Sequence, residues 1–154
     1  MPTHSADTSA PTLPYLIGRV NQGIRRELGK RLEPWALSIP EYTLLSVLKR
    51  RPGLSNAQLA RRGLLTPQST GEVLARLEER GVVSRKVDPN HARILRTELT
   101  RAGARLLEDV EPAAHEMQEQ MLGGVTARQR ETALNVLTHM MDRLADGLDH
   151  PNHR

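Results

Sequence analysis

Residues 54–99 read LSNAQLARRGLLTPQSTGEVLARLEERG followed by VVSRKVDPNHARILRTEL, and this stretch decides the fold. Near its start, Ser55 and Gln58 form a capping box, in which the serine hydroxyl accepts the glutamine amide and the glutamine side chain reaches back. The box predicts a short helix that begins at Asn56. Gly63 and the two leucines after it are too short for anything but a tight turn.

The sequence predicts a second helix directly after this turn. Thr66 is a favourable N-cap, and Pro67 occupies the first helical position, where its missing amide hydrogen costs nothing. Apolar residues then recur three and four positions apart, at Val73, Leu74 and Leu77. Small polar side chains that can hydrogen-bond with base edges in a DNA major groove stand at the start, at Gln68, Ser69 and Thr70. We interpret the pair as a helix-turn-helix, although an ordinary helical hairpin with a solvated face shows the same spacing.

The second half of the stretch predicts a β-hairpin. Gly81 ends the helix after Arg80, and residues 82–87 alternate with the period of a strand. Turn-forming residues follow, at Asp88, Pro89 and Asn90. A hairpin behind a helix-turn-helix is a wing, and basic side chains stand around its tip, at Lys86, His91 and Arg93.

Arg93 has two interpretations that are compatible with each other. A long arginine on a projecting hairpin can enter a minor groove or pair with a phosphate. It can also form an internal ion pair, most simply with Asp88, that holds the turn in shape. We expect Arg93 to contact DNA when DNA is present.

The basic charge of the chain is concentrated on this segment. Residues 41–105 hold 13 Lys or Arg against 6 Asp or Glu, whereas residues 106–154 hold 4 against 9. A local excess of this kind is typical of a surface that binds phosphate. The cations expected to contact the DNA backbone are Lys49, Arg50, Arg51, Arg61, Arg62, Arg76, Arg80, Arg85 and Lys86.

Apolar residues at helical spacing predict three more helical segments outside this stretch. One covers residues 13–33, one starts at Thr100 and bends near Pro112, and the last opens at a capping box of Thr126 and Gln129. These segments either pack only on their own domain or pair two copies of the chain. Pairing is favoured, because a dimer of helix-turn-helix lobes reads two half-sites about 34 Å apart and a monomer only a few base pairs.

The expected fold is therefore mainly α with a small β-hairpin wing. A winged helix-turn-helix lobe, about residues 40–99, is joined to terminal dimerisation helices, about residues 13–33 and 100–148. Together they form a single domain over residues 13–148. Residues 1–12 are expected to be a disordered arm, and residues 149–154 a frayed tail.

The order of these motifs resembles the MarR family of bacterial transcription regulators. The resemblance rests on the LSNAQLA helix, the TPQS start of the second helix, the LEERGVV segment, the wing with Asp88 and Arg93, and LRTELT before Gly103. It spans about residues 13–148. Gly63 stands where a helix former is usual in such sequences, which leaves the end of the first helix open by a residue or two.

The resemblance implies a homodimer that binds double-stranded DNA at a near-palindromic operator, with recognition helices in successive major grooves. It also implies repression that a small ligand releases. By position, Gln68, Ser69 and Thr70 match recognition-helix residues, and Arg93 matches the wing arginine. The full set of residues expected at the DNA is Ser55, Thr66, Pro67, Gln68, Ser69, Thr70, Arg76, Arg80, Lys86, His91 and Arg93.

A small organic, aromatic effector is the expected regulatory input. The resemblance implies a pocket between the dimer helices and the DNA-binding lobe, and the candidates by position are Tyr15, Arg19, Trp35 and Tyr42. Trp35 and Tyr42 have an alternative interpretation as core residues around a helix opened by Ser38 and Glu41. The chain has no cysteine, so a thiol or disulfide switch is excluded.

Neither a cofactor nor a metal site is expected. The histidines form no pair three or four residues apart within a predicted helix, and His139 with Asp142 offers only two ligands. An enzyme is not expected either, because the chain has no nucleophile elbow, phosphate-cradling glycine loop or metal triad. No segment approaches about 18 consecutive apolar residues, and the start of the chain is no signal peptide, so no membrane partner and a cytoplasmic location are expected.

The sequence thus predicts a sequence-specific, double-stranded DNA-binding transcription regulator, a ligand-responsive repressor that acts as a homodimer. An architectural protein that coats DNA with little sequence preference would carry the same basic lobe. A winged helix that binds protein is disfavoured by that charge. The dependence of DNA binding on salt and on sequence separates the first two possibilities.

Overall fold

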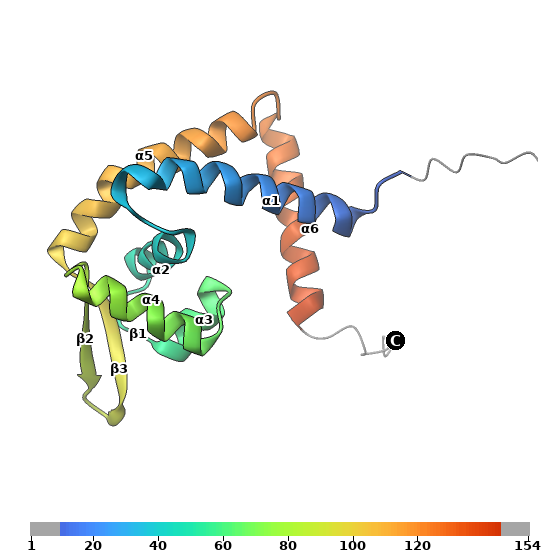
Figure 1. The fold of residues 1–154 in the computed structure, drawn as a ribbon. Helices are drawn as coiled ribbons and strands as arrows, with labels where there is room; N and C mark the ends of the chain where they lie inside the picture. Colours follow the sequence, from blue (N-terminus) through green and yellow to red (C-terminus); the bar gives the residue numbers. More distant parts are fainter. Residues whose placement is uncertain (1–9, 146–154) are drawn as a thin grey trace, which may run out of the picture. The chain divides into compact units, whose positions relative to one another are not determined.

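The computed structural model describes residues 10–145, and these residues form helices with one small sheet (Figure 1). The predicted fold class, mainly α with a β-hairpin wing, is confirmed. The chain divides into two compact units, the first ending at Met117 and the second beginning at Gln118. In chain order the elements are α1 (Leu13–Leu32), the 3₁₀ helix η1 (Glu33–Trp35), α2 (Ile39–Arg50), β1 (Leu54–Ser55), α3 (Asn56–Gly63), α4 (Pro67–Glu79), β2 (Val83–Asp88), β3 (His91–Leu99), α5 (Arg101–Met121) and α6 (Ala127–Ala145).

A three-stranded antiparallel sheet with the order β1-β3-β2 lies in the first unit. The predicted hairpin is its larger part, with Val83 opposite Leu99 at the base of the wing. The sequence did not indicate β1, which pairs Leu54 with Thr97. A strand of two residues is too short to show an alternating pattern, but it fixes the start of α3 to the central strand of the wing.

Leucine and valine side chains fill the core of the first unit, which includes the end of α1 and parts of α2, α3, α4 and α5. The largest fully buried apolar side chains are Leu32, Leu44, Leu45, Leu48, Leu59, Leu74, Leu77, Leu107 and Val110. Close packing reaches the backbone at Gly103, where a Cβ atom would lie 2.0 Å from the carbonyl oxygen of Val82. Helix α5 therefore begins in direct contact with the residue that leads into β2.

The helix boundaries follow the capping signals in the sequence. Ser55 Oγ accepts the Gln58 amide at 3.3 Å, and Gln58 Oε1 accepts the Ser55 amide at 2.9 Å, so the capping box is confirmed. Thr66 is the N-cap of α4 and Pro67 its first residue. Gly81, with φ 69°, follows the end of α4 as predicted.

The turn between α3 and α4 starts one residue later than predicted. Helix α3 continues through Gly63, and Leu64 is its left-handed C-cap. Packing explains the shift, because a Cβ atom at position 63 would lie 2.8 Å from Leu44 Cδ2. The glycine allows this close approach, and Leu64 adopts the left-handed conformation that ends the helix.

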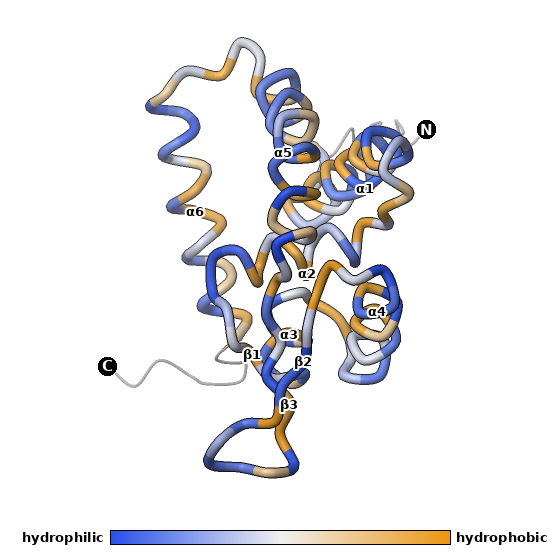
Figure 2. The backbone as a smooth tube through the Cα atoms, turned by 90° about the vertical axis from the view of Figure 1, so that its left-hand side faces the viewer, coloured by the Kyte–Doolittle hydropathy of each residue, from blue (hydrophilic) through white to orange (hydrophobic). Residues whose placement is uncertain are grey.

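The second unit contains the end of α5 and the whole of α6. Its predicted capping box is confirmed, since Gln129 Oε1 accepts the Thr126 amide at 2.9 Å and Thr126 Oγ1 accepts the Gln129 amide at 3.3 Å. Hydrophobic and hydrophilic residues alternate along α6 (Figure 2). Apolar side chains of α6 that are exposed are Leu134, Val136, Leu137, Met141 and Leu144.

Two expectations concern parts of the chain that lie outside the described residues. These are most of the predicted N-terminal arm and the whole predicted tail, residues 149–154. Within residues 10–145, no helix is long and apolar enough to cross a membrane.

Candidate nucleic-acid interface

Helix α4 presents a polar start to solvent. Thr66, the N-cap, accepts a hydrogen bond from the Ser69 amide with its Oγ1 at 3.1 Å and donates one to Ser69 Oγ at 3.0 Å. These two hydrogen bonds fix the Thr66 and Ser69 side chains relative to each other. Pro67 and Gln68 are exposed beside them, and Gln68 Nε2 donates to Glu72 Oε1 at 3.4 Å. Among the predicted recognition residues, Gln68 thus keeps its amide at the surface, where it can reach a base edge.

Thr70 lies on the opposite, buried face of the helix. Its side chain is fully buried, and its Oγ1 donates to the Thr66 carbonyl at 2.9 Å. This placement corrects the expectation that Thr70 faces the groove. The spacing contained the signal, because Thr70 stands three residues before Val73 and seven before Leu77, on the apolar face of the helix.

Asn56 joins the two helices of the motif, a role that the sequence did not indicate. Its Nδ2 donates to the carbonyl of Pro67 at 3.1 Å, which ties the start of α3 to the start of α4. Ser55, predicted to be at the DNA, is half-buried and uses its hydroxyl in the capping box. The first helix therefore positions the second one.

The tip of the wing is widened by an irregular register. Asp88 pairs with His91, whereas Val87 pairs with Leu95, so Ala92, Arg93 and Ile94 have no partner on β2. Arg93 lies in the middle of this bulge and is exposed. It makes no hydrogen bond or ion pair with any residue in the described part of the chain. A groove of about 460 Å³ lies between the wing, α4 and the start of α3, and Arg93 is among its lining residues.

The internal partner of Asp88 is Arg96, and this corrects the alternative of an Asp88–Arg93 pair. Arg96 Nε lies 2.5 Å from Asp88 Oδ2, and Asp88 is buried. The other carboxylate oxygen accepts the amides of Asn90 at 2.7 Å and His91 at 3.1 Å. The hydrogen bond from Arg96, followed by that from Asn90, holds the pKa of Asp88 below its usual value.

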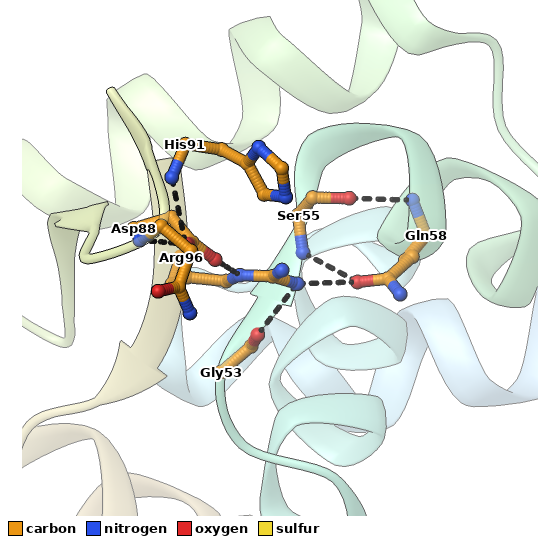
Figure 3. A network of polar contacts seen from close by, with 7 residues as sticks. Gly53, Ser55, Gln58, Asp88, His91 and Arg96 are labelled. Atoms are coloured by element: carbon orange, nitrogen blue, oxygen red, sulfur yellow. Dashed lines mark hydrogen bonds and ion pairs between the residues drawn. The ribbon is translucent and has the colours of Figure 1, made fainter. Parts of the chain in front are cut away.

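Arg96 also connects the wing to α3. Its Nη1 donates to Gln58 Oε1 at 3.1 Å and to the Gly53 carbonyl at 3.4 Å (Figure 3). Gln58 is the capping-box residue that accepts the Ser55 amide. A continuous chain of polar contacts therefore runs from the turn of the wing to the N-cap of α3, and it sets where the wing stands relative to the helix-turn-helix.

Arg80, predicted to contact DNA, fastens α4 to the segment between α1 and α2. Its Nη1 donates to the Ala36 carbonyl and its Nη2 to the Trp35 carbonyl, both at 2.9 Å. Ala36 has φ 50°, so the guanidinium braces a left-handed turn at a residue other than glycine. Arg76 lies 3.7 Å from the buried carboxylate of Glu41, a second link between α4 and this region.

The predicted backbone contacts separate into two groups. Those with a partner inside the chain are Arg76, Arg80, Arg85, which pairs with Glu78, and Lys49, which pairs with Glu111. The hydrogen bond from Arg85 lowers the pKa of Glu78. Of these predicted contacts, Arg50, Arg51, Arg61, Arg62 and Lys86 are exposed without a hydrogen bond or ion pair among residues 10–145, and the same holds for Arg93 on the wing. The second group is available to phosphates.

The four effector candidates are not brought together within one chain. Arg19 Nη1 donates to the Tyr15 hydroxyl at 3.1 Å, and its guanidinium carbon lies 5.9 Å from the centre of the tyrosine ring. Trp35 and Tyr42 are partly buried against the core. Because Tyr15 is in the first turn of α1 and Trp35 follows its last turn, about 25 Å of helix separates the two pairs.

Comparison with known proteins places these features in a family. The MarR family model matches residues 37–94. The transcriptional repressor Rv2887 of Mycobacterium tuberculosis is 36% identical over 118 residues, which cover 77% of this chain and 85% of the relative. The chain belongs to the MarR family. Its winged helix is therefore that of a MarR-family transcription regulator.

Two solved structures of the Rv2887 protein show what this MarR relative binds. In one it is in complex with DNA, and the match has 33% identity, a TM-score of 0.70 and coverage of 85% of this chain and 98% of that one. In the other it is in complex with salicylic acid, with 33% identity, a TM-score of 0.69 and coverage of 86% and 98%.

Proposed function

We propose that this MarR-family chain is a ligand-responsive transcription repressor that binds a near-palindromic operator as a homodimer. The observation that carries the proposal is the division of the basic residues. The arginines that brace the fold are paired, while those on the wing tip, α3 and the end of α2 are exposed and unpaired within residues 10–145. Cations without an internal partner are the ones that can neutralise phosphates and release counterions.

The contacts with DNA divide into positioning and readout. Gln68, at the exposed start of α4, would reach base edges in the major groove, where an amide can pair with adenine. Arg93, on the bulged wing, would enter the adjacent minor groove. Lys86, His91, Thr66 and Pro67 remain candidates beside these two. Thr70 is left out of the contact set because its side chain is buried.

The homodimer is supported by large apolar residues that are exposed in the described part of the chain. On α1 they are Leu13, Leu16, Ile17 and Val20, all exposed. Helix α6 offers a similar series. Exposed apolar surface of this extent is typical of an interface, and pairing two copies supplies the second recognition helix that a palindromic operator requires.

A small aromatic acid is the effector class that we favour. The relative Rv2887 is solved with salicylic acid and with p-aminosalicylic acid. In this chain Tyr15 supplies an aromatic face and Arg19 a guanidinium that can pair with a carboxylate. Trp35 and Tyr42 would join them only if a second copy lies against α1. We place the protein in the cytoplasm, with its target DNA, and assign it no catalytic activity.

The test is the fluorescence anisotropy of a labelled duplex from the region upstream of the protein's own gene, against a shuffled duplex of equal length. A repressor should prefer the native duplex by at least about a thousandfold, and the preference should persist as salt rises. Salicylate should then weaken binding. Equal and steeply salt-dependent binding to both duplexes would instead support an architectural protein.

A further inference from the structure

Leu64 combines a strained backbone with an exposed apolar side chain. It caps α3 with φ 55° and ψ 41°, the left-handed conformation that branched side chains seldom adopt. Its side chain is 90% exposed, more than any other large apolar side chain in the described part of the chain. Glycine is the usual residue at such a helix end, so both features of Leu64 work against folding.

Packing within the first unit does not account for this leucine. A Cβ atom at the adjacent Gly63 would lie 2.8 Å from Leu44 Cδ2, so an alanine there would push against the end of that buried side chain. The backbone of Leu64 donates its amide hydrogen to the Ala60 carbonyl, a contact that any residue but proline could make. The leucine side chain itself therefore has no structural function that requires it.

The surroundings of Leu64 indicate what its side chain contacts. The last turn of α3, just before it, carries Arg61 and Arg62, both exposed and without a hydrogen bond or ion pair among residues 10–145. Just after it, Thr66 and Gln68 form the polar start of α4. This arrangement is complementary to DNA, in which apolar groups lie beside phosphates. The apolar groups are thymine methyl groups and deoxyribose rings, and they would face Leu64 while the phosphates face Arg61 and Arg62.

We propose that Leu64 contacts DNA, seating its side chain against an apolar group of the duplex beside the phosphates bound by Arg61 and Arg62. The inference rests on the proposed function, since it adds a contact to the same interface. It explains why a left-handed, exposed position holds leucine: the residue contributes to binding at the expense of stability.

Three variants test the proposal in full-length protein. L64M keeps an apolar side chain, whereas L64G and L64N remove it and suit the left-handed conformation. L64G and L64N should unfold at a higher temperature than the wild type. They should also bind the labelled upstream duplex roughly tenfold more weakly, as the loss of one buried leucine contact implies. L64M should bind like the wild type. Because L64N adds none of the backbone freedom of glycine, a loss shared by both variants reports the missing side chain.

Single replacements of thymine by deoxyuridine in the duplex identify the apolar group. If Leu64 touches a thymine methyl, one replacement weakens wild-type binding and leaves L64G unaffected. If it touches a deoxyribose, every replacement affects wild type and L64G equally, while the loss caused by L64G remains. Either pattern supports the contact and names its chemistry.

The failure of this proposal can be told apart from the failure of the proposed function. Specific binding by the wild type, together with equally tight binding by L64G and L64N, would overturn the contact and leave the repressor intact. Absence of specific binding by the wild type would overturn both.

Discussion

Arg96 and Asp88 form an ion pair between the two strands of the wing, with Arg96 Nε 2.5 Å from Asp88 Oδ2, and Arg96 Nη1 also donates to Gln58 Oε1 on α3. The Asp88 side chain is 7% exposed and that of Arg96 33%, so water has little access to the pair. Removing one member of such a pair is costly, because the other charge stays buried. The position of the wing, and with it the position of Arg93, therefore depends on Arg96.

R93A and R96A should both weaken operator binding, by different routes. R93A removes the contact itself and should cost about 1–3 kcal/mol of binding free energy with little change in the free energy of unfolding. R96A should lower both affinity and stability, because it releases the wing. In the R93A background, R96A should cost no further affinity, which a double-mutant cycle by anisotropy checks. Additive losses would show that Arg96 does not act through Arg93.

Stability should decrease in acid through Asp88. Hydrogen bonds from Arg96, then from Asn90, lower the pKa of Asp88 in the folded chain. The pair therefore stabilises the fold fully above the unfolded-state pKa, about 4, and this contribution is lost as the pH falls through the lower folded-state pKa. D88N should flatten the loss of stability below about pH 4, measured by urea unfolding over a pH series. E78Q should remove a second, separate contribution of the same sign, because the hydrogen bond from Arg85 lowers the pKa of Glu78. A D88N profile that falls below about pH 4 as steeply as the wild type would contradict the role of Asp88.

Arg80 should prove to be a structural residue of α4. Its two hydrogen bonds to the Trp35 and Ala36 carbonyls predict that R80A lowers the free energy of unfolding by about 1.5–3 kcal/mol. R50A removes an exposed, unpaired arginine and should leave stability unchanged. Chemical denaturation of both variants checks this. If R80A keeps wild-type stability but loses operator affinity, Arg80 contacts DNA as the sequence alone suggested.

The sequence predicted those parts of the fold that depend on near neighbours. The capping boxes of Ser55 with Gln58 and of Thr126 with Gln129 each join residues three apart, so their pattern is visible in a short window. Strand β1 was missed because Leu54 pairs with Thr97, which is far along the chain. Spacing within a segment carries no information about such a partner.

The candidate site shows the same limit. The alternative that Asp88 pairs with Arg93, the nearest arginine after the turn, is wrong, because Arg93 lies exposed in the bulge and Arg96 pairs with the carboxylate. Whether an arginine has an internal hydrogen bond or ion pair likewise depends on residues far away in the sequence. The acceptors of Arg80 are carbonyls in the segment between α1 and α2, and no motif marks them.

Substitutions of Gln68 and Thr70 should have different effects on operator affinity and stability, although both residues stand at the start of α4. T70V retains the shape of a buried side chain and removes one hydrogen bond, so it should cost at most about 1 kcal/mol of stability and no operator affinity. Q68A should cost about 1–3 kcal/mol of binding free energy and no stability. Anisotropy and thermal unfolding of both variants check the pair. If T70V loses as much operator affinity as Q68A, Thr70 contacts DNA and the prediction is wrong.

Gly103 should be the least replaceable glycine of the first unit. A Cβ atom there would lie 2.0 Å from the Val82 carbonyl oxygen, a backbone atom that cannot move without separating α5 from the start of β2. G103A should therefore lower the free energy of unfolding by about 3 kcal/mol or more. At Gly23, inside α1, an added Cβ atom would meet nothing within 4 Å, so G23A should raise stability by about 0.5–1 kcal/mol. Urea unfolding of the two alanine variants measures both changes in the free energy of unfolding. Equal stabilities of the two variants would contradict the close contact between α5 and Val82.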